Sequence, residues 1–135
     1  MPTYASLINR KPVVPSSRKR FLTVDAHFFA KLLRPRLEKV FVDEAWYLAT
    51  YPDVSEAIKH GVVPGAKAHF SLFGYYEHRM PHAITVDETW YLQEYPDVRD
   101  VVGSRHFASG QMHFELLDYR EGRFPYPRFE FKSVE

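Results

Sequence analysis

The sequence predicts an all-α protein in which two and a half short helical repeats pack as one small domain. The main observation is the stretch Val-Asp-Glu-x-Trp-Tyr-Leu-x-x-Tyr-Pro-Asp-Val, which occurs at residues 42–54 and again at residues 86–98. The copies start 44 positions apart (86 − 42), and the match continues without a gap to give 17 identities over the 40 positions of residues 42–81 (unit one) and 86–125 (unit two). A period of this length is typical of one supersecondary unit that is repeated and stacked.

The composition is that of a folded domain without disulfides. Of the 135 residues, 45% are apolar and 16% are aromatic, which excludes a disordered chain. No cysteine is present, so disulfides and thiolate metal sites are excluded. The sequence has neither an apolar run near the roughly 18 residues of a membrane helix nor the apolar segment of a secretory signal. We therefore expect a cytoplasmic protein.

Residues 1–20 are predicted to form a flexible basic arm. They contain five basic residues and no acidic one, while the whole chain has a formal net charge of +1, so the remaining residues sum to −4 (1 − 5). Prolines and a serine pair in the same stretch favour a mobile segment. Arg18, Lys19 and Arg20 are therefore candidate interaction residues, either for an acidic face of this or a neighbouring subunit or for phospholipid or nucleic acid.

Residues 21–41 resemble a shortened and weakly matching copy of the repeat, a half unit that precedes unit one. The Val-Asp-x-x-Phe-Phe stretch at residues 24–29 matches the Val-Asp-Glu-x-Trp-Tyr opening of the full units. We expect one helix that ends near Leu33, because the residue before Pro35 avoids the helical region. Terminal units of repeat proteins are commonly atypical because they cap the stack.

Each full unit is predicted to form three short helices. Asp43 and Asp87 are expected to cap the first helix through their carboxylates. The valine before each cap has the spacing of a hydrophobic staple to Tyr47 or Tyr91. Proline then ends the first helix and opens the second. The expected limits of the second helix are Pro52 and Gly61 in unit one, and Pro96 and Gly103 or Ser104 in unit two.

The third helix of each unit is expected to be the central one, because apolar residues cover a wide part of its surface. It is predicted to start near Gly65 and Ser109 and to end near Glu77 and Glu121, with Gly122 as the stop in unit two. A minor β-ribbon is also expected between units. The stretches that could pair are residues 39–42, residues 83–86 and residues 127–131, the last within the tail 126–135.

Two roles are open for the repeated aromatic and histidine residues. Exposed rings of Trp46 and Trp90 would form a stacking platform for sugars or bases, whereas buried rings would anchor the helical core. The staple spacing favours the core role. His69 and His113 lack further ligands at metal-binding spacing, so we expect buried histidines bonded to a backbone carbonyl rather than a metal site.

Arg79 and Arg123 recur with a glutamate two residues before and a proline two residues after. They could hold an anionic ligand, or they could tie each helix end to the following unit. Because one active site rarely needs two copies, the repetition favours the structural role. The sequence has no nucleophile elbow, phosphate loop, dinucleotide fingerprint or paired-carboxylate motif. We therefore predict that the protein is not an enzyme and binds no cofactor.

The tandem Trp-Tyr-Leu-x-x-Tyr-Pro-Asp-Val stretches, the His-Phe pair and the closing Glu-x-Arg-x-Pro resemble modules of bacterial proteins linked to cell-surface polysaccharides, some of them fused to glycosyltransferases. The resemblance covers about residues 42–127. The chain departs from the pattern at His78, where a glycine is usual, and at Asp118, which stands in the place of Gly74. The resemblance implies a bacterial, non-catalytic accessory or adaptor near polysaccharide synthesis or export.

Three functions are open from the sequence. The leading one is an interaction or regulatory module that binds a protein partner, such as a glycosyltransferase, the polysaccharide synthesis machinery or a second copy of itself. The first alternative is a glycan-binding module that uses exposed aromatic rings. The second is a nucleic-acid-binding protein that uses the arm, which requires basic residues on the folded surface as well. The exposure of Trp46 and Trp90 separates the first two.

Overall fold

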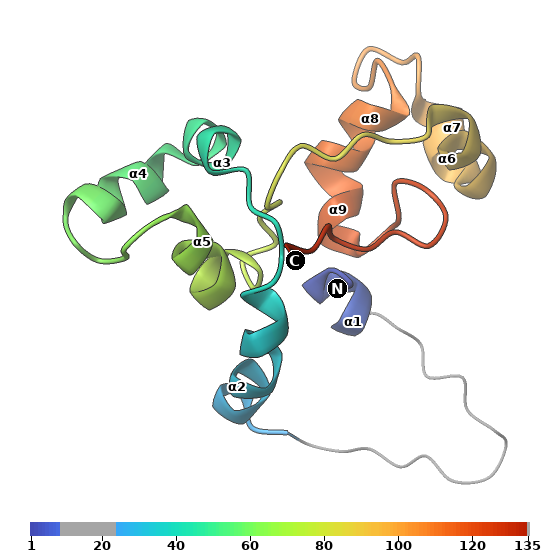
Figure 1. The fold of residues 1–135 in the computed structure, drawn as a ribbon. Helices are drawn as coiled ribbons and strands as arrows, with labels where there is room; N and C mark the ends of the chain where they lie inside the picture. Colours follow the sequence, from blue (N-terminus) through green and yellow to red (C-terminus); the bar gives the residue numbers. More distant parts are fainter. Residues whose placement is uncertain (9–23, 135) are drawn as a thin grey trace, which may run out of the picture.

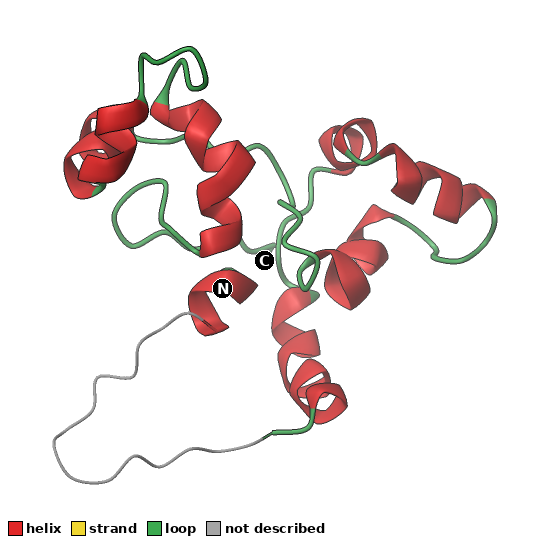
Figure 2. Ribbon diagram, turned by 180° about the vertical axis from the view of Figure 1, so that it is seen from behind, coloured by secondary structure: helices red, strands yellow, loops and turns green. Residues whose placement is uncertain are grey.

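The structure is all-α, as the sequence predicts. The computed structural model describes residues 1–8 and 24–134, and these residues contain no sheet. Figures 1 and 2 show helices and loops in two lobes, one from each unit, with α2 (Ala26–Leu37) below them and both chain ends in the centre. Within the described residues, no helix has the length and apolar character needed to cross a bilayer.

The two units contain matching helices. Unit one consists of α3 (Glu44–Thr50), α4 (Pro52–Lys59), α5 (Ala66–His69) and the π-helical turn η1 (Phe70–Gly74). Unit two consists of α6 (Glu88–Glu94), α7 (Pro96–Val101), α8 (Gly110–His113), the π-helical turn η2 (Phe114–Asp118) and α9 (Tyr119–Glu121). A short helix near the amino terminus, α1 (Tyr4–Ile8), lies outside both units.

An aspartate caps the helix that opens each unit, as predicted. The carboxylate of Asp43 accepts from the Trp46 amide at 3.0 Å, and that of Asp87 accepts from the Trp90 amide at 3.1 Å. In the half unit, Asp25 accepts from the amide three residues later at 3.0 Å. These bonds satisfy amides that the first helical turn leaves without partners.

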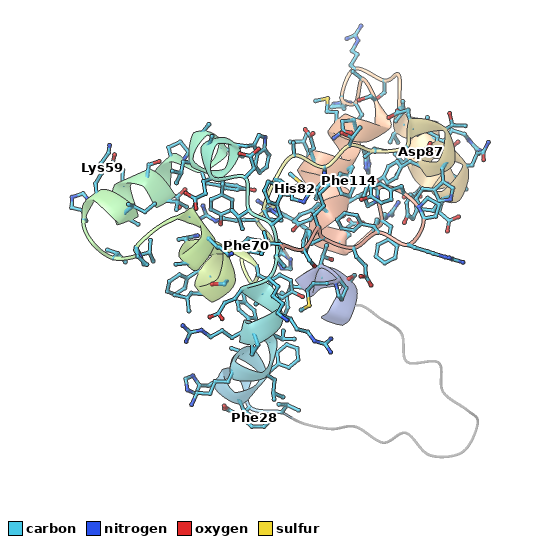
Figure 3. All side chains as sticks on the ribbon, in the orientation of Figure 1. Phe28, Lys59, Phe70, His82, Asp87 and Phe114 are labelled. Atoms are coloured by element: carbon cyan, nitrogen blue, oxygen red, sulfur yellow. The ribbon has the colours of Figure 1, made fainter. Side chains whose placement is uncertain are left out.

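The helix of the half unit, α2, is longer than predicted. It continues through Pro35 to Leu37 instead of ending near Leu33. The proline costs about 3 kcal/mol in a helix interior. Leu37 and Val40 are almost fully buried, which contributes about 1.5–3 kcal/mol for each side chain and holds the last turn in place. At the other end of α2, Phe28 is 56% exposed and points away from the lobes (Figure 3).

The third helix of each unit widens into a π-helical turn. In unit one the Tyr75 amide donates to the Phe70 carbonyl, five residues earlier, at 2.9 Å. In unit two the Tyr119 amide donates in the same way to the Phe114 carbonyl, also five residues earlier. Such turns are rare in proteins overall, but those that do occur often lie at functional sites.

The ends of the third helices follow the prediction more closely in unit two. Ser109 caps α8 and Gly122, at φ 79°, ends α9. In unit one the regular helix ends at Gly74 rather than near Glu77. The reason is a tight turn over residues 75–78, in which backbone amides bond three residues back and His78 adopts φ 57°.

Each unit closes on itself through one backbone hydrogen bond. The Asp43 amide donates to the Pro81 carbonyl at 3.0 Å, and the Asp87 amide donates to the Pro125 carbonyl at 2.9 Å. The start of the first helix is thereby joined to the residue that ends the unit. The core extends through both units, and its largest fully buried aromatic side chains are Tyr47, Tyr75, Tyr91, Phe70 and Phe114.

Residues 1–8 do not belong to a flexible arm, so the prediction is wrong for this segment. The Tyr75 hydroxyl donates to the Pro2 carbonyl at 3.0 Å, and the Phe131 amide donates to the Met1 carbonyl at 3.0 Å. Small side chains allow this close packing, because they fit where larger ones would collide. Three of them are buried: Thr3, Ala5 and Ser6.

The expected β-ribbon is reduced to an isolated antiparallel bridge between Val40 and Ser133. Backbone hydrogen bonds of 2.8 and 2.7 Å flank the bridge on its two sides. Residues 39–42 therefore pair with the end of the tail and not with residues 127–131. The pairing fixes the entry to unit one against the carboxyl-terminal segment.

Candidate binding pocket between the two units

Arg79 and Arg123 make the same ion pairs in their two units. Arg79 donates to the two carboxylate oxygens of Asp53 at 2.9 and 2.7 Å, and to Glu77 at 2.7 Å. Arg123 lies 3.0 and 2.7 Å from the two oxygens of Asp97. Hydrogen bonding by the guanidinium holds the pKa of each aspartate below its ordinary value.

Each of these guanidinium groups also lies over a tyrosine ring. The distance from the guanidinium carbon to the ring centroid is 4.9 Å at both Tyr51 and Tyr95. The hydroxyls of these tyrosines accept from the amides of Met80 and Phe124, at 2.9 and 3.0 Å. The arginines therefore tie the end of the third helix to the second helix of their own unit, and not to the following unit as predicted.

A buried tyrosine and a buried histidine meet inside each unit. In unit one the Tyr47 hydroxyl lies 3.0 Å from Nδ1 of His69. In unit two the carboxylate of Asp118 stands between them, accepting from the Tyr91 hydroxyl and, at 2.8 Å, from Nδ1 of His113. Burial raises the pKa of both tyrosines above the ordinary value, so the phenols stay neutral. The histidine partners are side chains and not the backbone carbonyls that were expected.

The exchange of Gly74 for Asp118 explains the difference between the two clusters. A Cβ at Gly74 would overlap the Tyr47 hydroxyl, so glycine leaves room for the tyrosine to reach the histidine directly. His113 and Asp118 are five residues apart, a spacing that a π-helical turn places on one side. Spacings of three or four residues, which an α-helix brings together, do not reveal this pair. The sequence signal for it is His-x-x-x-x-Asp.

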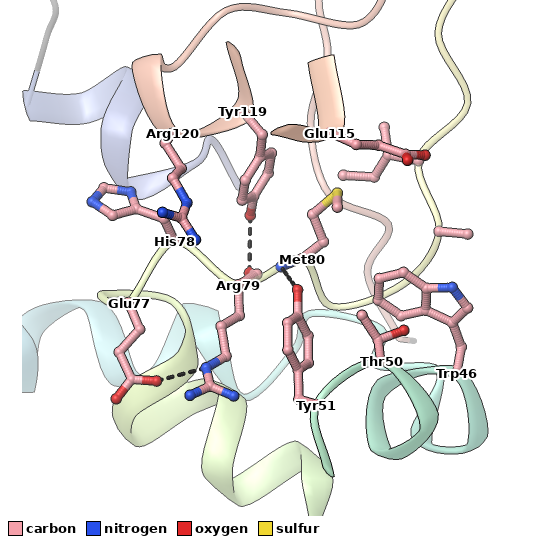
Figure 4. Close-up of a pocket in the computed structure, with 12 residues that line it drawn as sticks. Trp46, Thr50, Tyr51, Glu77, His78, Arg79, Met80, Glu115, Tyr119 and Arg120 are labelled. Atoms are coloured by element: carbon pink, nitrogen blue, oxygen red, sulfur yellow. Dashed lines mark hydrogen bonds and ion pairs between the residues drawn. The ribbon is translucent and has the colours of Figure 1, made fainter. Parts of the chain in front are cut away.

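A pocket of about 790 Å³ lies between the two units. Figure 4 shows Trp46 and Tyr51 of unit one on one side, and Tyr119 and Arg120 of unit two on the other. The Tyr119 hydroxyl donates to the Arg79 carbonyl at 3.0 Å, which joins the two walls. Other side chains that line the pocket are Thr50, Glu77, His78, Met80 and Glu115.

The two tryptophans are half-buried and differ in what surrounds them. Trp46 lies edge-to-face with Tyr51 at 6.1 Å between ring centroids, and Trp90 lies in the same way against Tyr95 at 6.0 Å. Both pack against the core, but the fully buried ring of each first helix belongs to the tyrosine that follows the tryptophan. Trp46 lines the pocket between the units, whereas Trp90 does not border it.

The structure brings two of the predicted interaction residues together. Trp46 and Arg79 both line the pocket, and Trp90 and Arg123 occupy the equivalent places in unit two. The remaining part of the predicted arm, residues 9–20, lies outside the residues that the structure describes. It includes the candidate interaction residues Arg18, Lys19 and Arg20.

Three charged or titratable pocket residues were not among the predicted site residues: His78, Glu115 and Arg120. Each stands where the two units differ, and the equivalent residues 44 positions away are Gly122, Ser71 and Tyr76. Repeated residues build the units, whereas the polar groups of the pocket come from positions that are not repeated. The sequence signal for them is a charged or titratable residue in one unit whose equivalent in the other unit, 44 positions away, is neither.

Within residues 1–8 and 24–134, no group of three or more His, Asp or Glu side chains is placed to hold a metal ion. Comparison of the chain with protein-family models, with curated proteins and with solved structures finds no match.

Proposed function

We propose that the protein is a non-catalytic accessory module that binds a saccharide in the pocket between its two units. The observation that carries the proposal is the half-buried indole of Trp46 in a pocket otherwise rich in charged and hydroxyl groups. Aromatic rings pack against the apolar faces of sugars, while polar side chains bond to sugar hydroxyls. The volume of about 790 Å³ lies within the roughly 300–1,000 Å³ of small-ligand pockets.

The polar groups of the pocket support the same class of ligand. The indole N–H of Trp46 and the hydroxyl of Thr50 have no hydrogen-bond partner in the described parts of the chain. One oxygen of Glu115 accepts from Gln111 at 2.6 Å, which leaves the other for a ligand hydroxyl. A saccharide offers both the acceptors and the donors that these groups need.

The resemblance of the repeated units to modules of polysaccharide-linked proteins supports a role beside polysaccharide biosynthesis or export. In this role the protein holds a saccharide chain next to a partner such as a glycosyltransferase, in the cytoplasm. The protein itself supplies binding and positioning, and the partner supplies the chemistry.

Titration calorimetry with a panel of neutral and acidic oligosaccharides tests the proposal. Trp46→Ala is expected to weaken binding at least about tenfold, because the ring contact and the indole N–H are lost. Trp90→Ala is the matched control, since Trp90 makes the same edge-to-face contact outside the pocket. An equal loss in the two variants, or no binding of any oligosaccharide, contradicts the proposal.

Exposed apolar side chains favour a protein partner as a second candidate function. Leu72 and Phe73 in unit one are 39% and 46% exposed, and the equivalent Leu116 and Leu117 in unit two are 54% and 44% exposed. Apolar side chains that gather on a surface mark interaction sites. A Leu72→Ser, Leu116→Ser variant is expected to lose self-association in sedimentation, or binding to the host's glycosyltransferases. Unchanged assembly and unchanged binding contradict this candidate.

A further inference from the structure

The charged side chains that line the pocket differ in whether they already have a partner. Glu77 accepts from Arg79 at 2.7 Å, and the other guanidinium nitrogens of Arg79 bond to Asp53. Glu115 accepts from a neighbouring glutamine side chain. Arg120 is exposed and makes no hydrogen bond or ion pair with any residue that the structure describes. The positive charge that is available to a ligand is therefore that of Arg120.

A second donor without a partner lies beside Arg120. Figure 4 shows the ring of His78 next to the Arg120 side chain at one end of the pocket. The ring has no hydrogen-bond partner among the described residues. Burial, and then the charge of Arg120, lowers the pKa of His78, so near neutral pH the ring is uncharged and offers one N–H. Together the two side chains can bind an anionic group.

The opposite end of the pocket has a carboxylate that no cation among the described residues neutralises, whereas Glu77, on the His78 side, is paired with Arg79. Figure 4 places Glu115 and Trp46 there, away from His78. The Glu115 carboxylate repels an anion, so the negative group of a ligand is directed to Arg120. The aromatic ring and the carboxylate suit the uncharged part of a sugar, with its apolar face and its hydroxyls.

We propose that the ligand of this pocket is an acidic saccharide whose uronate carboxylate is bound by Arg120 and His78. The inference rests on the proposed saccharide function and adds the charge of the ligand to it. A guanidinium binds a carboxylate through two parallel hydrogen bonds, and the imidazole N–H adds a third. The sugar ring then faces Trp46, and Glu115 accepts from its hydroxyls. A neutral saccharide leaves the charge of Arg120 uncompensated.

Titration calorimetry with uronic-acid trimers and their methyl esters tests the inference. The probes are trimers of galacturonate, glucuronate and mannuronate, and each is compared with its ester, which keeps the shape and removes the charge. We expect at least one acid trimer to bind at least about tenfold more tightly than its ester. Arg120→Gln is expected to lose this preference and to keep the affinity for the ester. Arg99→Gln, which removes an exposed arginine outside the pocket, keeps the preference.

Equal affinity for acid and ester, or an unchanged preference in Arg120→Gln, overturns the inference and leaves the saccharide function standing. Binding of none of the acids and none of the esters overturns both. Displacement of the acid trimer by an equal concentration of inorganic phosphate shows a general anion site and overturns the assignment to a saccharide. Because Arg120 is exposed and unpaired, its substitution is expected to leave the fold intact, which circular dichroism checks.

Discussion

The position shared by Gly74 and Asp118 decides how a buried tyrosine meets a buried histidine in each unit. Asp118 is 0% exposed, and its second carboxylate oxygen lies 3.5 Å from Nε of Arg123. A buried carboxylate costs free energy unless donors or opposite charge compensate it. Tyr91 and His113 donate to one oxygen, while the other has no hydrogen bond and is compensated only by the nearby charge of Arg123. Unit one has no charge at this place. The same backbone arrangement thus holds a direct tyrosine–histidine hydrogen bond in unit one and a tyrosine–carboxylate–histidine cluster in unit two.

Gly74→Ala is expected to destabilise the protein by about 1–3 kcal/mol, because overpacking a filled site displaces its neighbours. The added methyl group would overlap the hydroxyl of Tyr47, a side chain that is fully buried. Gly65→Ala is the matched control, since a Cβ there meets nothing within 4 Å. Urea denaturation measures both variants. A Gly74→Ala protein as stable as the control would show that Tyr47 moves freely.

The stability is expected to decrease as the pH falls through the ordinary histidine pKa of 6.5. Burial, followed by the charge of Arg79, lowers the pKa of His69 below its ordinary value of 6.5. The unfolded chain therefore takes up a proton near that pH and the folded protein does not, so stability is complete above the ordinary pKa and is lost below it until the lowered pKa is reached. His78 acts in the same direction.

Urea denaturation across this pH range measures the decrease. His69→Gln keeps a hydrogen-bonding group for Tyr47 and removes one titrating site, so we expect a shallower decrease in this variant. An identical slope in the wild type and in His69→Gln would show that His69 is not the source. The ion-paired Asp53 and Asp97 do not contribute in this range, because hydrogen bonding by the arginines holds their pKa below the ordinary value of 3.8.

At the residue scale, the sequence showed which repeated residues are structural, but not which residues they contact. The repeat singled out His69 and Arg79 as structural residues, but the expected partners were a backbone carbonyl and the following unit, whereas the contacts are with Tyr47 and Asp53. The partner of His69 lies 22 residues away in the sequence, and such a pairing depends on how two helices pack. Arg120 carries no repeated signal at all, because the equivalent residue of unit one is Tyr76.

At the scale of the elements, α1 contacts both units. A Cβ at Gly122 would lie 2.7 Å from the Ser6 amide nitrogen and 2.8 Å from the Ala5 carbonyl carbon, so α1 packs directly on the end of unit two. On its other side Tyr4 lies edge-to-face with Tyr76 of unit one, at 5.3 Å. The helix therefore bridges the units close to His78 and the pocket.

Gly122→Ala is expected to destabilise the protein by about 2–4 kcal/mol. About 1 kcal/mol comes from the left-handed backbone at φ 79°, and about 1–3 kcal/mol comes from the collision with α1. Gly61→Ala is the matched control: its φ is 71° and nothing lies within 4 Å, so it should show the backbone cost alone. Denaturation and hydrogen exchange at Ser6 measure the two effects. Equal losses in the two variants would mean that α1 does not pack on Gly122.

The elements with a local signal were predictable, and those fixed by distant contacts were not. Aspartate caps, proline starts and glycine ends act on neighbouring backbone groups, so the sequence shows them directly. The extension of α2 past Pro35 depends on the burial of Leu37, and the docking of α1 depends on the absence of a side chain at Gly122. Neither condition is visible in the segment that it affects.

At the scale of the whole molecule, each unit relies on segments outside it. Phe70 of unit one lies edge-to-face with Phe131 of the tail at 6.0 Å, and Leu37 and Val40 of the half unit belong to the same core. The Tyr119 hydroxyl of unit two is bonded to the backbone of unit one. The pocket forms only where the two units meet, so the sequence of a single unit does not reveal it.

A fragment of residues 41–83 is expected to show no cooperative thermal transition. It loses the segments that cover Phe70, and its helices are too short to be stable alone, since isolated helices below about 12 residues are marginal in water. Circular dichroism compares the fragment with the full chain, for which a cooperative transition is expected. A sigmoidal melting curve of the fragment would contradict the prediction.

The pocket takes one wall from each of two adjacent units, so an array carries one pocket fewer than it has units. Because each unit closes through its own backbone hydrogen bond, insertion of a further unit of 44 residues would leave that bond intact in its neighbours. Such an insertion would add a second pocket at a fixed spacing from the first. Linked pockets raise the avidity for a polymer by roughly 10²–10⁴ when both engage at once. The number of units would then set how tightly a long saccharide chain is held, with no change in any single pocket.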